Sequence, residues 1–269
     1  PVPPEGQPRQ RSWVVRAKRV VFATGALERP LVFRNNDLPG IMLASAAQGY
    51  AKRFGVLPGR NAVVFTNNDS AYQTAIDLAS SGVNVSALVD ARGKVPATLA
   101  AEVRAAGIEI LPGMVVQRAK GWQKLRAVEI ATLSSDGKST SGPTRRISCD
   151  MLAISGGYSP VVHLMSHLGG RPTYDDAKQA FVPGNLLGTN QEAVGGCTGD
   201  WTDEVPSRAI WKVPQPKGGM GKAFIDFQHD VSTKDVELAH REGYVSVEHL
   251  KRYTMLGMAT DQGKTANIA

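Results

Sequence analysis

The chain has 269 residues, 42% of them hydrophobic, which suffices to bury a core and excludes an intrinsically disordered protein. Its 31 Lys and Arg residues exceed its 24 Asp and Glu residues, giving a net charge of +7, but no nucleic-acid-binding module accompanies this charge, so we expect no nucleic-acid partner. No apolar run reaches the roughly 18 residues that a membrane span needs, so we expect no membrane contact.

The first part of the chain is predicted to alternate between strands and helices. After a loose, proline-rich start at 1–11, a strand or hairpin leads into a buried strand at 20–23. The elements that follow are a helix within 41–55, a strand–helix–strand unit at 63–90, a helix and strand within 97–113, an antiparallel pair at 114–133, a polar hairpin or loop at 134–146, and a buried strand within 147–157. This order predicts a mostly parallel sheet with a small antiparallel layer.

Past Pro160 the pattern becomes shorter and more broken. We predict a short helix at 160–170, strand fragments at 179–183 and 193–200, and a linker at 205–222 that is rich in proline and glycine. Two helices follow. Ser232 and Asp235 have the spacing of a capping box for the first, which Gly243 ends; Ser246 caps the second, which Gly257 ends.

Three glycine-bearing segments follow predicted strands and are candidates for cofactor contact. They are Ala23-Thr24-Gly25, Gly156-Gly157 and Gly199-Asp200. Glycine at a strand end allows the backbone to approach a ligand closely, and an aspartate after it offers a carboxylate to ribityl or ribose hydroxyls. The alternative is that these segments are ordinary strand ends and glycine-rich turns.

The strand–helix–strand unit has the layout of a dinucleotide-binding domain but lacks its glycines. Where such a unit reads G-x-G-x-x-G, this one reads Thr66-Asn67-Asn68-Asp69-Ser70-Ala71, which places Thr66, Asn68 and Ala71 on the glycine positions. The helix start still favours an anion, but Asp69 would repel a phosphate while capping the helix. The turn is either a rebuilt pyrophosphate site or a structural unit that binds no nucleotide.

Asp90 ends the second strand of this unit, 24 residues after Thr66. A carboxylate in this place accepts hydrogen bonds from a ribose diol and repels a 2′-phosphate, which favours NAD over NADP. The alternative is a solvated aspartate in a turn.

Residue types that often carry chemistry are few. Cys149 and Cys197, the only cysteines, form neither a CxxC pair nor a metal-ligand spacing, and two cysteines in a chain of this size suit a reducing cytoplasm. His163 and His167 are four residues apart on one short predicted helix, but no third ligand lies nearby in the sequence, which favours packing or a solvated face. We therefore predict no metal site and name no catalytic residue.

Four stretches of this sequence resemble the alpha subunit of heterotetrameric sarcosine oxidase. They are "FATGALERPLVFRNNDLPGIMLASA", "VVFTNNDSAYQTAIDLASSGVNV", "LAISGGYSPVVHLMSHLGG" and "GKAFIDFQHDVSTKDVELAHREGYVSVEHLKRYTMLGMATDQGKT". Together they span most of the chain, and the last is long and specific. The resemblance implies that the Thr66 turn is a family feature.

The resemblance also implies a function. It implies a complex that oxidatively demethylates sarcosine to glycine, in which the alpha subunit carries NAD in a flavoprotein-like fold and the beta subunit holds FAD and FMN. The other subunits of that complex are the implied partners. Related amine and imino-acid dehydrogenases share the alpha-type fold, so the substrate stays open.

Measured against this family, the chain is expected to be a middle section. The N-terminal βαβ unit with its glycine-rich loop and the C-terminal folate-binding domain lie outside it, and the long helix expected after Gly199-Asp200 is missing. We expect an α/β, Rossmann-like fold with two dinucleotide-binding-type domains. Residues 1–37 and 151–204 form parts of a first domain, 38–150 an inserted second domain, and 205–269 a linker and helical connector.

The leading hypothesis is an NAD-binding-type section of a cytoplasmic sarcosine oxidase alpha subunit that is inactive alone. The first alternative is a non-catalytic assembly module with a degenerate nucleotide site, or a subunit of a related amine or imino-acid dehydrogenase. A free-standing NAD(P)H:acceptor reductase is disfavoured, because neither a complete phosphate loop nor a redox cysteine pair is present.

Overall fold

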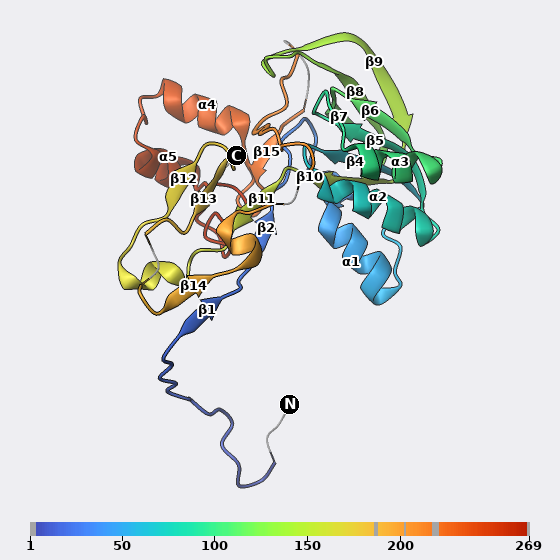
Figure 1. The fold of residues 1–269 in the computed structure, drawn as a ribbon. Coiled ribbons are helices and arrows are strands. Elements are labelled where there is room, and N and C mark those ends of the chain that lie inside the picture. The colour runs from blue at the N-terminus through green and yellow to red at the C-terminus, as the bar shows by residue number, and fades with distance from the viewer. Residues whose placement is uncertain (1–3, 186–187, 202, 217–220, 268–269) are drawn as a thin grey trace.

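A parallel five-stranded sheet forms the core of one lobe (Figure 1). The computed structural model describes residues 4–185, 188–201, 203–216 and 221–267. The strands run in the order β3, β10, β4, β5, β6, and every neighbouring pair is parallel. Their bounds are Ile41–Leu43, Met151–Ser155, Asn61–Thr66, Asn84–Asp90 and Glu109–Pro112.

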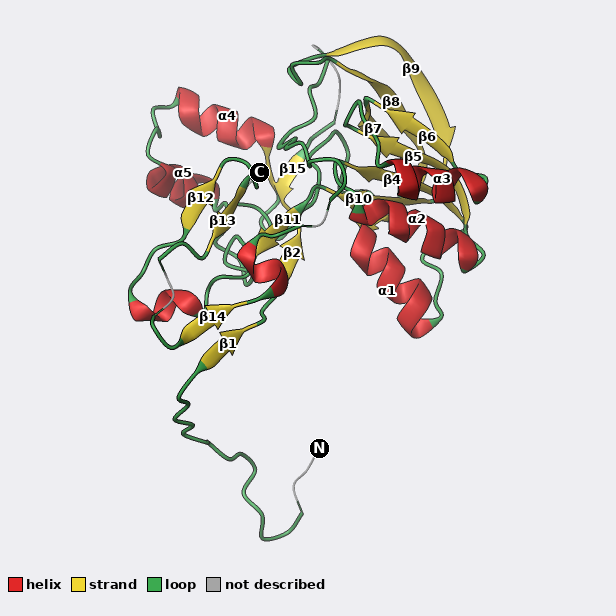
Figure 2. Cartoon of the chain, in the orientation of Figure 1, coloured by secondary structure: helices red, strands yellow, loops and turns green. Residues whose placement is uncertain are grey.

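Both faces of this sheet are covered, which makes the lobe three-layered (Figure 2). On one face of the sheet, every second residue of the strands, such as Val64 and Leu88, packs against helices. These helices are α1 (Ala44–Phe54), α2 (Ser70–Ser80) and α3 (Ala97–Ala105). The neighbouring residues Val63 and Val89 pack on the other face against an antiparallel sheet. That sheet consists of β7 (Met114–Gly121), β8 (Leu125–Leu133) and β9 (Thr140–Ser148). Strands buried on both faces explain the continuous apolar runs of the sequence.

The polar segment at 134–146, expected to be a hairpin or loop, forms the turn after β8 and the first part of β9, which pairs with β8 as a hairpin. Strand β10, which begins at Met151, lies between β3 and β4 in the parallel sheet. The division of the chain into a first and an inserted second domain stays a prediction.

In the part of the chain that the structure describes, the other lobe contains four two-stranded sheets, connecting loops and the two C-terminal helices. The sheets are β1 (Val20–Phe22) with β14 (Gln191–Ala193), β2 (Ala26–Glu28) with β11 (Tyr158–Pro160), β12 (Thr173–Asp175) with β13 (Ala180–Val182), and β15 (Phe224–Asp226) with β16 (Val231–Ser232). The strand expected to be buried at 20–23 is largely exposed, since β1 pairs only with β14 and Val21 is 53% exposed. The helix expected at 160–170 is one 3-10 turn, Met165–Leu168.

The C-terminal helices α4 (Thr233–Arg241) and α5 (Val247–Thr254) carry the predicted capping signal. The capping box of Ser232 and Asp235 is confirmed, because each side chain bonds to the other residue's backbone. The end of α5 differs from the prediction, since Met255 directly follows the helix in the left-handed conformation and Gly257, with a φ of 67°, lies two residues beyond it. None of the helices among the described residues is long and apolar enough to cross a membrane.

Candidate functional site

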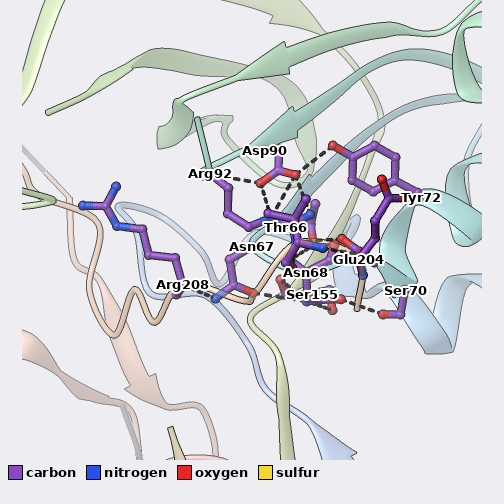
Figure 3. A network of polar contacts seen from close by, with 12 residues as sticks. Thr66, Asn67, Asn68, Ser70, Tyr72, Asp90, Arg92, Ser155, Glu204 and Arg208 are labelled. Atoms are coloured by element: carbon purple, nitrogen blue, oxygen red, sulfur yellow. Dashed lines mark hydrogen bonds and ion pairs between the residues drawn. The ribbon is translucent and has the colours of Figure 1, made fainter. Parts of the chain in front are cut away.

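The turn after β4, where a dinucleotide-binding domain receives pyrophosphate, is packed with its own polar side chains (Figure 3). Thr66, Asn67, Asn68 and Asp69 are each at most 5% exposed. The Thr66 hydroxyl accepts a hydrogen bond from the Asn68 backbone N–H at 3.0 Å. Asn68 is not among the described residues that have a positive φ. Its backbone therefore does not adopt the left-handed conformation of the glycine whose position it takes.

The two asparagines of the turn are committed to neighbouring elements. Asn68 donates from Nδ2 to the Ser155 hydroxyl at 2.9 Å, at the end of β10, and its Oδ1 accepts from the Ser70 hydroxyl at 2.7 Å. Asn67 donates from Nδ2 to the carbonyl oxygen of Arg208 at 2.6 Å. The amide groups therefore tie the turn to β10, to α2 and to a distant part of the chain.

A buried charge cluster lies behind the turn. The Arg92 guanidinium contacts Asp69 at 2.7 Å and Asp90 at 2.8 Å, and the three side chains are 3%, 7% and 0% exposed. Tyr72 donates from its hydroxyl to Asp90 at 2.8 Å, and burial together with the Asp90 charge raises the pKa of Tyr72. Although burial lowers the pKa of Arg92, its bonds to the two carboxylates raise it overall, so the guanidinium stays charged.

Residues 203–208, named the strap from here on, cross the turn and bind this cluster. The backbone N–H of Glu204 donates to Asp69 Oδ2 at 2.6 Å, and Arg92 donates to the carbonyl oxygen of Val205 at 2.7 Å. The Glu204 carboxylate accepts from the backbone N–H of Ala97, the first residue of α3, at 2.7 Å. The strap includes the start of the predicted linker at 205–222. That linker is in part core, because Val213 is fully buried.

A pyrophosphate does not fit the turn as it is built. Within the described residues Asp69 makes no capping hydrogen bond to α2, contrary to the sequence expectation, because its carboxylate faces Arg92 and the strap. A phosphate at the start of α2 would meet this carboxylate and the strap backbone. Asp90, expected either to receive a ribose or to be solvated, is buried with its oxygens bonded to Arg92 and Tyr72.

A small cavity of about 190 Å³ opens beside the turn, at the meeting point of the two lobes. It joins four of the predicted site residues, namely Asn68, Ser70, Gly157 and Asp200, with Tyr158, Trp201, Asp203 and Ser207. The Ser70 and Tyr158 hydroxyls lie 2.9 Å apart at its wall. Burial and the nearby Asp69 charge raise the pKa of Asp203. The lining is hydroxylic, aromatic and acidic, which suits an uncharged or cationic group better than a phosphate.

Further predicted residues lie at the carboxyl ends of β1 and β14, and Asp200, which also lines the cavity, is one of them. Strands β1 and β14 are parallel, and their carboxyl ends lead into Ala23-Thr24-Gly25 and into the glycine-rich loop that ends at Gly199. Gly25 and Gly199 have φ of 70° and 74°, and the Thr24 hydroxyl donates to the carbonyl oxygen of Val161 at 2.6 Å. Asp200 is exposed and forms an ion pair with Lys178 at 2.5 Å.

Gly156 serves packing between the lobes. A methyl group on Gly156 would lie 2.7 Å from the carbonyl oxygen of Pro30, so a larger residue does not fit there. Gly156 also accepts a hydrogen bond from Asn67 through its carbonyl oxygen, at 3.3 Å. The described residues contain no group of three or more His, Cys, Asp or Glu side chains that could hold a metal ion, and His163 is exposed.

Comparison with known proteins gives consistent matches along the chain. Residues 220–269 match the sarcosine oxidase A3 domain family. The sarcosine oxidase subunit alpha of Rhizobium meliloti is 39% identical over 97% of this chain, and that of Corynebacterium sp. (strain P-1) is 40% identical over 98% of it. The chain is a homologue of one section of the sarcosine oxidase alpha subunit. It spans 28% and 31% of the length of these two relatives.

Similarity to solved structures shows the fold of the chain. L-proline dehydrogenase from P. horikoshii is 21% identical, with a TM-score of 0.62, over 93% of this chain and 51% of its own. This similarity confirms the predicted α/β, Rossmann-like fold class. The family resemblance that the motifs carried is confirmed by the two sarcosine oxidase alpha subunits.

The local sequence pattern did not reveal the groups that fill the turn. Arg92 carried a local signal, because it follows Asp90 by two residues, and an arginine so close to a strand-end aspartate can fold back on it. Tyr72 lies on the buried face of α2 and reads as an ordinary core residue. The strap carried no local signal, since 135 residues separate Asp69 from Glu204.

Proposed function

We propose that this chain is a non-catalytic section of a sarcosine oxidase alpha subunit, within a complex that oxidatively demethylates sarcosine to glycine. The observation that carries the proposal is the 39–40% identity to two such subunits over at least 97% of the chain. The site supports the non-catalytic role, because its buried charges pair with one another instead of facing a substrate. The flavins FAD and FMN then belong to a partner subunit.

Association with that partner gives the direct test. The tagged chain is co-expressed with the beta subunit of a sarcosine oxidase and purified through the tag. We expect the beta subunit and its flavin absorbance to co-purify, and we expect sarcosine-dependent peroxide only when the beta subunit is present. Peroxide production by the chain alone, above a heat-treated control, or failure of the two chains to associate would contradict the proposal.

NAD, if this section holds it, belongs at the carboxyl ends of β1 and β14 rather than at the Thr66 turn. Parallel strands that end side by side in glycine loops present free backbone groups to a nucleotide. Gly25 supports this place, because nothing lies within 4 Å of the position that a side chain would take. Asp200 follows Gly199 there with an exposed carboxylate, which contacts Lys178 and accepts a hydrogen bond from the Thr198 hydroxyl.

This cofactor site is tested by the nucleotides that the purified complex releases on denaturation. We expect NAD in the parent and its loss in Gly25→Val, where a β-branched side chain opposes a φ of 70°. Gly55→Val is the matched control, since Gly55 has a φ of 64° at the distant end of α1. If the parent, Gly25→Val and Gly55→Val released equal amounts of NAD, the end of β1 would not be part of the NAD site.

The second candidate function is a pure assembly module, and the filled Thr66 turn favours it. A strand–helix–strand unit whose phosphate position is taken by Asp69 keeps the fold without the ligand. Absence of any nucleotide in a complex that still oxidises sarcosine would favour this candidate over an NAD-binding section.

A further inference from the structure

The strap and the Thr66 turn are complementary in charge and in hydrogen bonding. Asp69 receives two backbone N–H groups of the strap, from Glu204 at 2.6 Å and from Val205 at 3.3 Å. A carboxylate bound by consecutive backbone N–H groups resembles an anion in an amide nest, here with the anion on the turn and the amides on the strap. The usual polarity of a phosphate loop is therefore reversed.

The strap also supplies an anion to the neighbouring helix. Pro96, at the N-cap position of α3, makes no capping hydrogen bond among the described residues, and Ala97 donates instead to the Glu204 carboxylate. A carboxylate at a helix start is favoured by the free N–H groups and the helix dipole. Glu204 thus satisfies from a distance a helix end that its own sequence leaves uncapped.

The far end of the strap is fixed to the turn as well. Arg208 donates its backbone N–H to the carbonyl oxygen of Asn67 at 3.4 Å, and its own carbonyl oxygen accepts from Asn67 Nδ2 at 2.6 Å. The strap is therefore held at both ends, by Asp69 and by Asn67. Asp203, just before the first attachment, and Ser207, between the two, form part of the wall of the cavity beside the turn.

We propose that residues 203–208 are the built-in ligand of the Thr66 turn, an intramolecular strap that binds where a dinucleotide-binding domain receives pyrophosphate. The recognised chemistry is a peptide backbone, which Asp69, Asn67 and Arg92 bind, and one carboxylate, that of Glu204, which the start of α3 binds. Binding of the strap closes the turn to nucleotides and completes the cavity that Ser70 and Tyr158 also line.

Hydrogen exchange measured by mass spectrometry tests this proposal, because a bound amide exchanges more slowly than a free one. In the parent chain we expect peptides covering 203–208 to exchange at least about tenfold more slowly than an unstructured peptide of the same sequence. Glu204→Pro removes the N–H that Asp69 receives, together with the carboxylate that Ala97 binds, and changes no residue of the turn. It should raise exchange at the remaining strap amides by about tenfold, while peptides from β4 and β10 keep their protection.

The variant on the turn side is Asp69→Ala, and its matched control is Asp176→Ala at an exposed aspartate. Asp69→Ala should release the strap as Glu204→Pro does, and trypsin should then cut after Arg208 faster than in the control. Trypsin cleavage and exchange report on the strap directly, so the test is independent of enzymatic activity. The proposal fails if strap amides of the parent exchange at the free-peptide rate, or if Glu204→Pro leaves their protection unchanged.

Discussion

Arg92 and Asp69 meet in the interior with their charged atoms 2.7 Å apart, although 23 residues separate them along the chain. Arg92 follows β5, and Asp69 lies between β4 and α2. The pair therefore connects the segments that follow two neighbouring parallel strands, at the same edge of the sheet. The same guanidinium holds Asp90 at 2.8 Å. One arginine therefore pairs with two buried carboxylates, and its removal leaves both without a positively charged partner.

We predict that Arg92→Leu lowers the free energy of unfolding by about 3–5 kcal/mol, because uncompensated buried charges are costly. The matched control is Arg145→Leu, which breaks an exposed pair with Glu109 whose side chains are 48% and 45% exposed. That change should cost less than about 1 kcal/mol. Urea unfolding of both variants gives the comparison, and equal losses would mean that the buried cluster adds nothing beyond a surface ion pair.

Glu28 should make the protein less stable as the pH rises. Its side chain is buried, with one oxygen bonded to the Ser45 hydroxyl and backbone and the other without a partner among the described residues. Burial raises the pKa of Glu28 above its usual 4.5, and this effect exceeds that of the hydrogen bonds from Ser45, which lower the pKa. The folded state therefore keeps its proton at a pH where the unfolded state has lost it, and stability falls as the pH rises above 4.5 towards the folded pKa.

Glu28→Gln should remove this pH dependence, because the amide carries no ionisable proton. The measurement is the unfolding free energy of parent and variant between pH 4 and pH 8, with Glu248→Gln at an exposed position as the control. We expect the variant to gain on the parent as the pH increases. A constant difference across the range would show that Glu28 titrates alike in both states.

Elements that rest on local pattern could be predicted from the sequence, whereas elements that rest on distant contacts could not. The parallel sheet follows from apolar runs such as Val63–Phe65, and the capping box from two residues three apart. The exposure of β1 depends on which strands cover it, which the local pattern of Val20 and Val21 does not reveal.

The filled turn shows the same limit at the site. The mismatch between Thr66-Asn67-Asn68-Asp69 and a glycine-rich loop indicated that the turn is unusual. The segment that fills the turn lies in a proline-rich stretch, which predicts a linker. Proline and glycine indicate irregular backbone, but they do not reveal whether that backbone is mobile or bound to another part of the chain. Only the fold brings Glu204 to Asp69.

A substitution at Leu250, on α5, tests whether the C-terminal helices pack against the rest of the protein. Leu250 packs against the cluster of Val32, Ile225 and Leu256, which joins the C-terminal region to the segment after β2. We predict that Leu250→Asp lowers the unfolding free energy by about 2 kcal/mol or more, since it places a charge among apolar side chains. Val247→Asp, on the same helix at a residue 69% exposed, should change it by less than about 0.5 kcal/mol. Thermal unfolding of both variants checks this, and equal effects would show that α5 does not pack on this cluster.

The last prediction concerns what the Thr66 turn binds once its own groups are removed. The parent chain should show no NAD binding at this turn by calorimetry, because Asp69 and the strap take the phosphate position. The double variant Asn68→Gly, Asp69→Ala removes a side chain from the phosphate path and a carboxylate from the start of α2. It also removes one of the two acceptors of Arg92 Nη1, the other being the carbonyl oxygen of Val205. A like charge beside a phosphate opposes binding by roughly 1 kcal/mol or more at a partly exposed site.

We therefore expect measurable NAD binding to the double variant, and its loss when Arg92→Leu is added to the same background. Folding must be checked by thermal unfolding, because Asn68 also bonds to Ser155 and Asp69 to Arg92. Gly25→Val in the double variant is the control for the other candidate edge, and it should leave binding at the turn intact. Tight binding by the parent that disappears on Asn68→Gly would instead mean that the asparagine itself holds the nucleotide, with the strap displaced on binding.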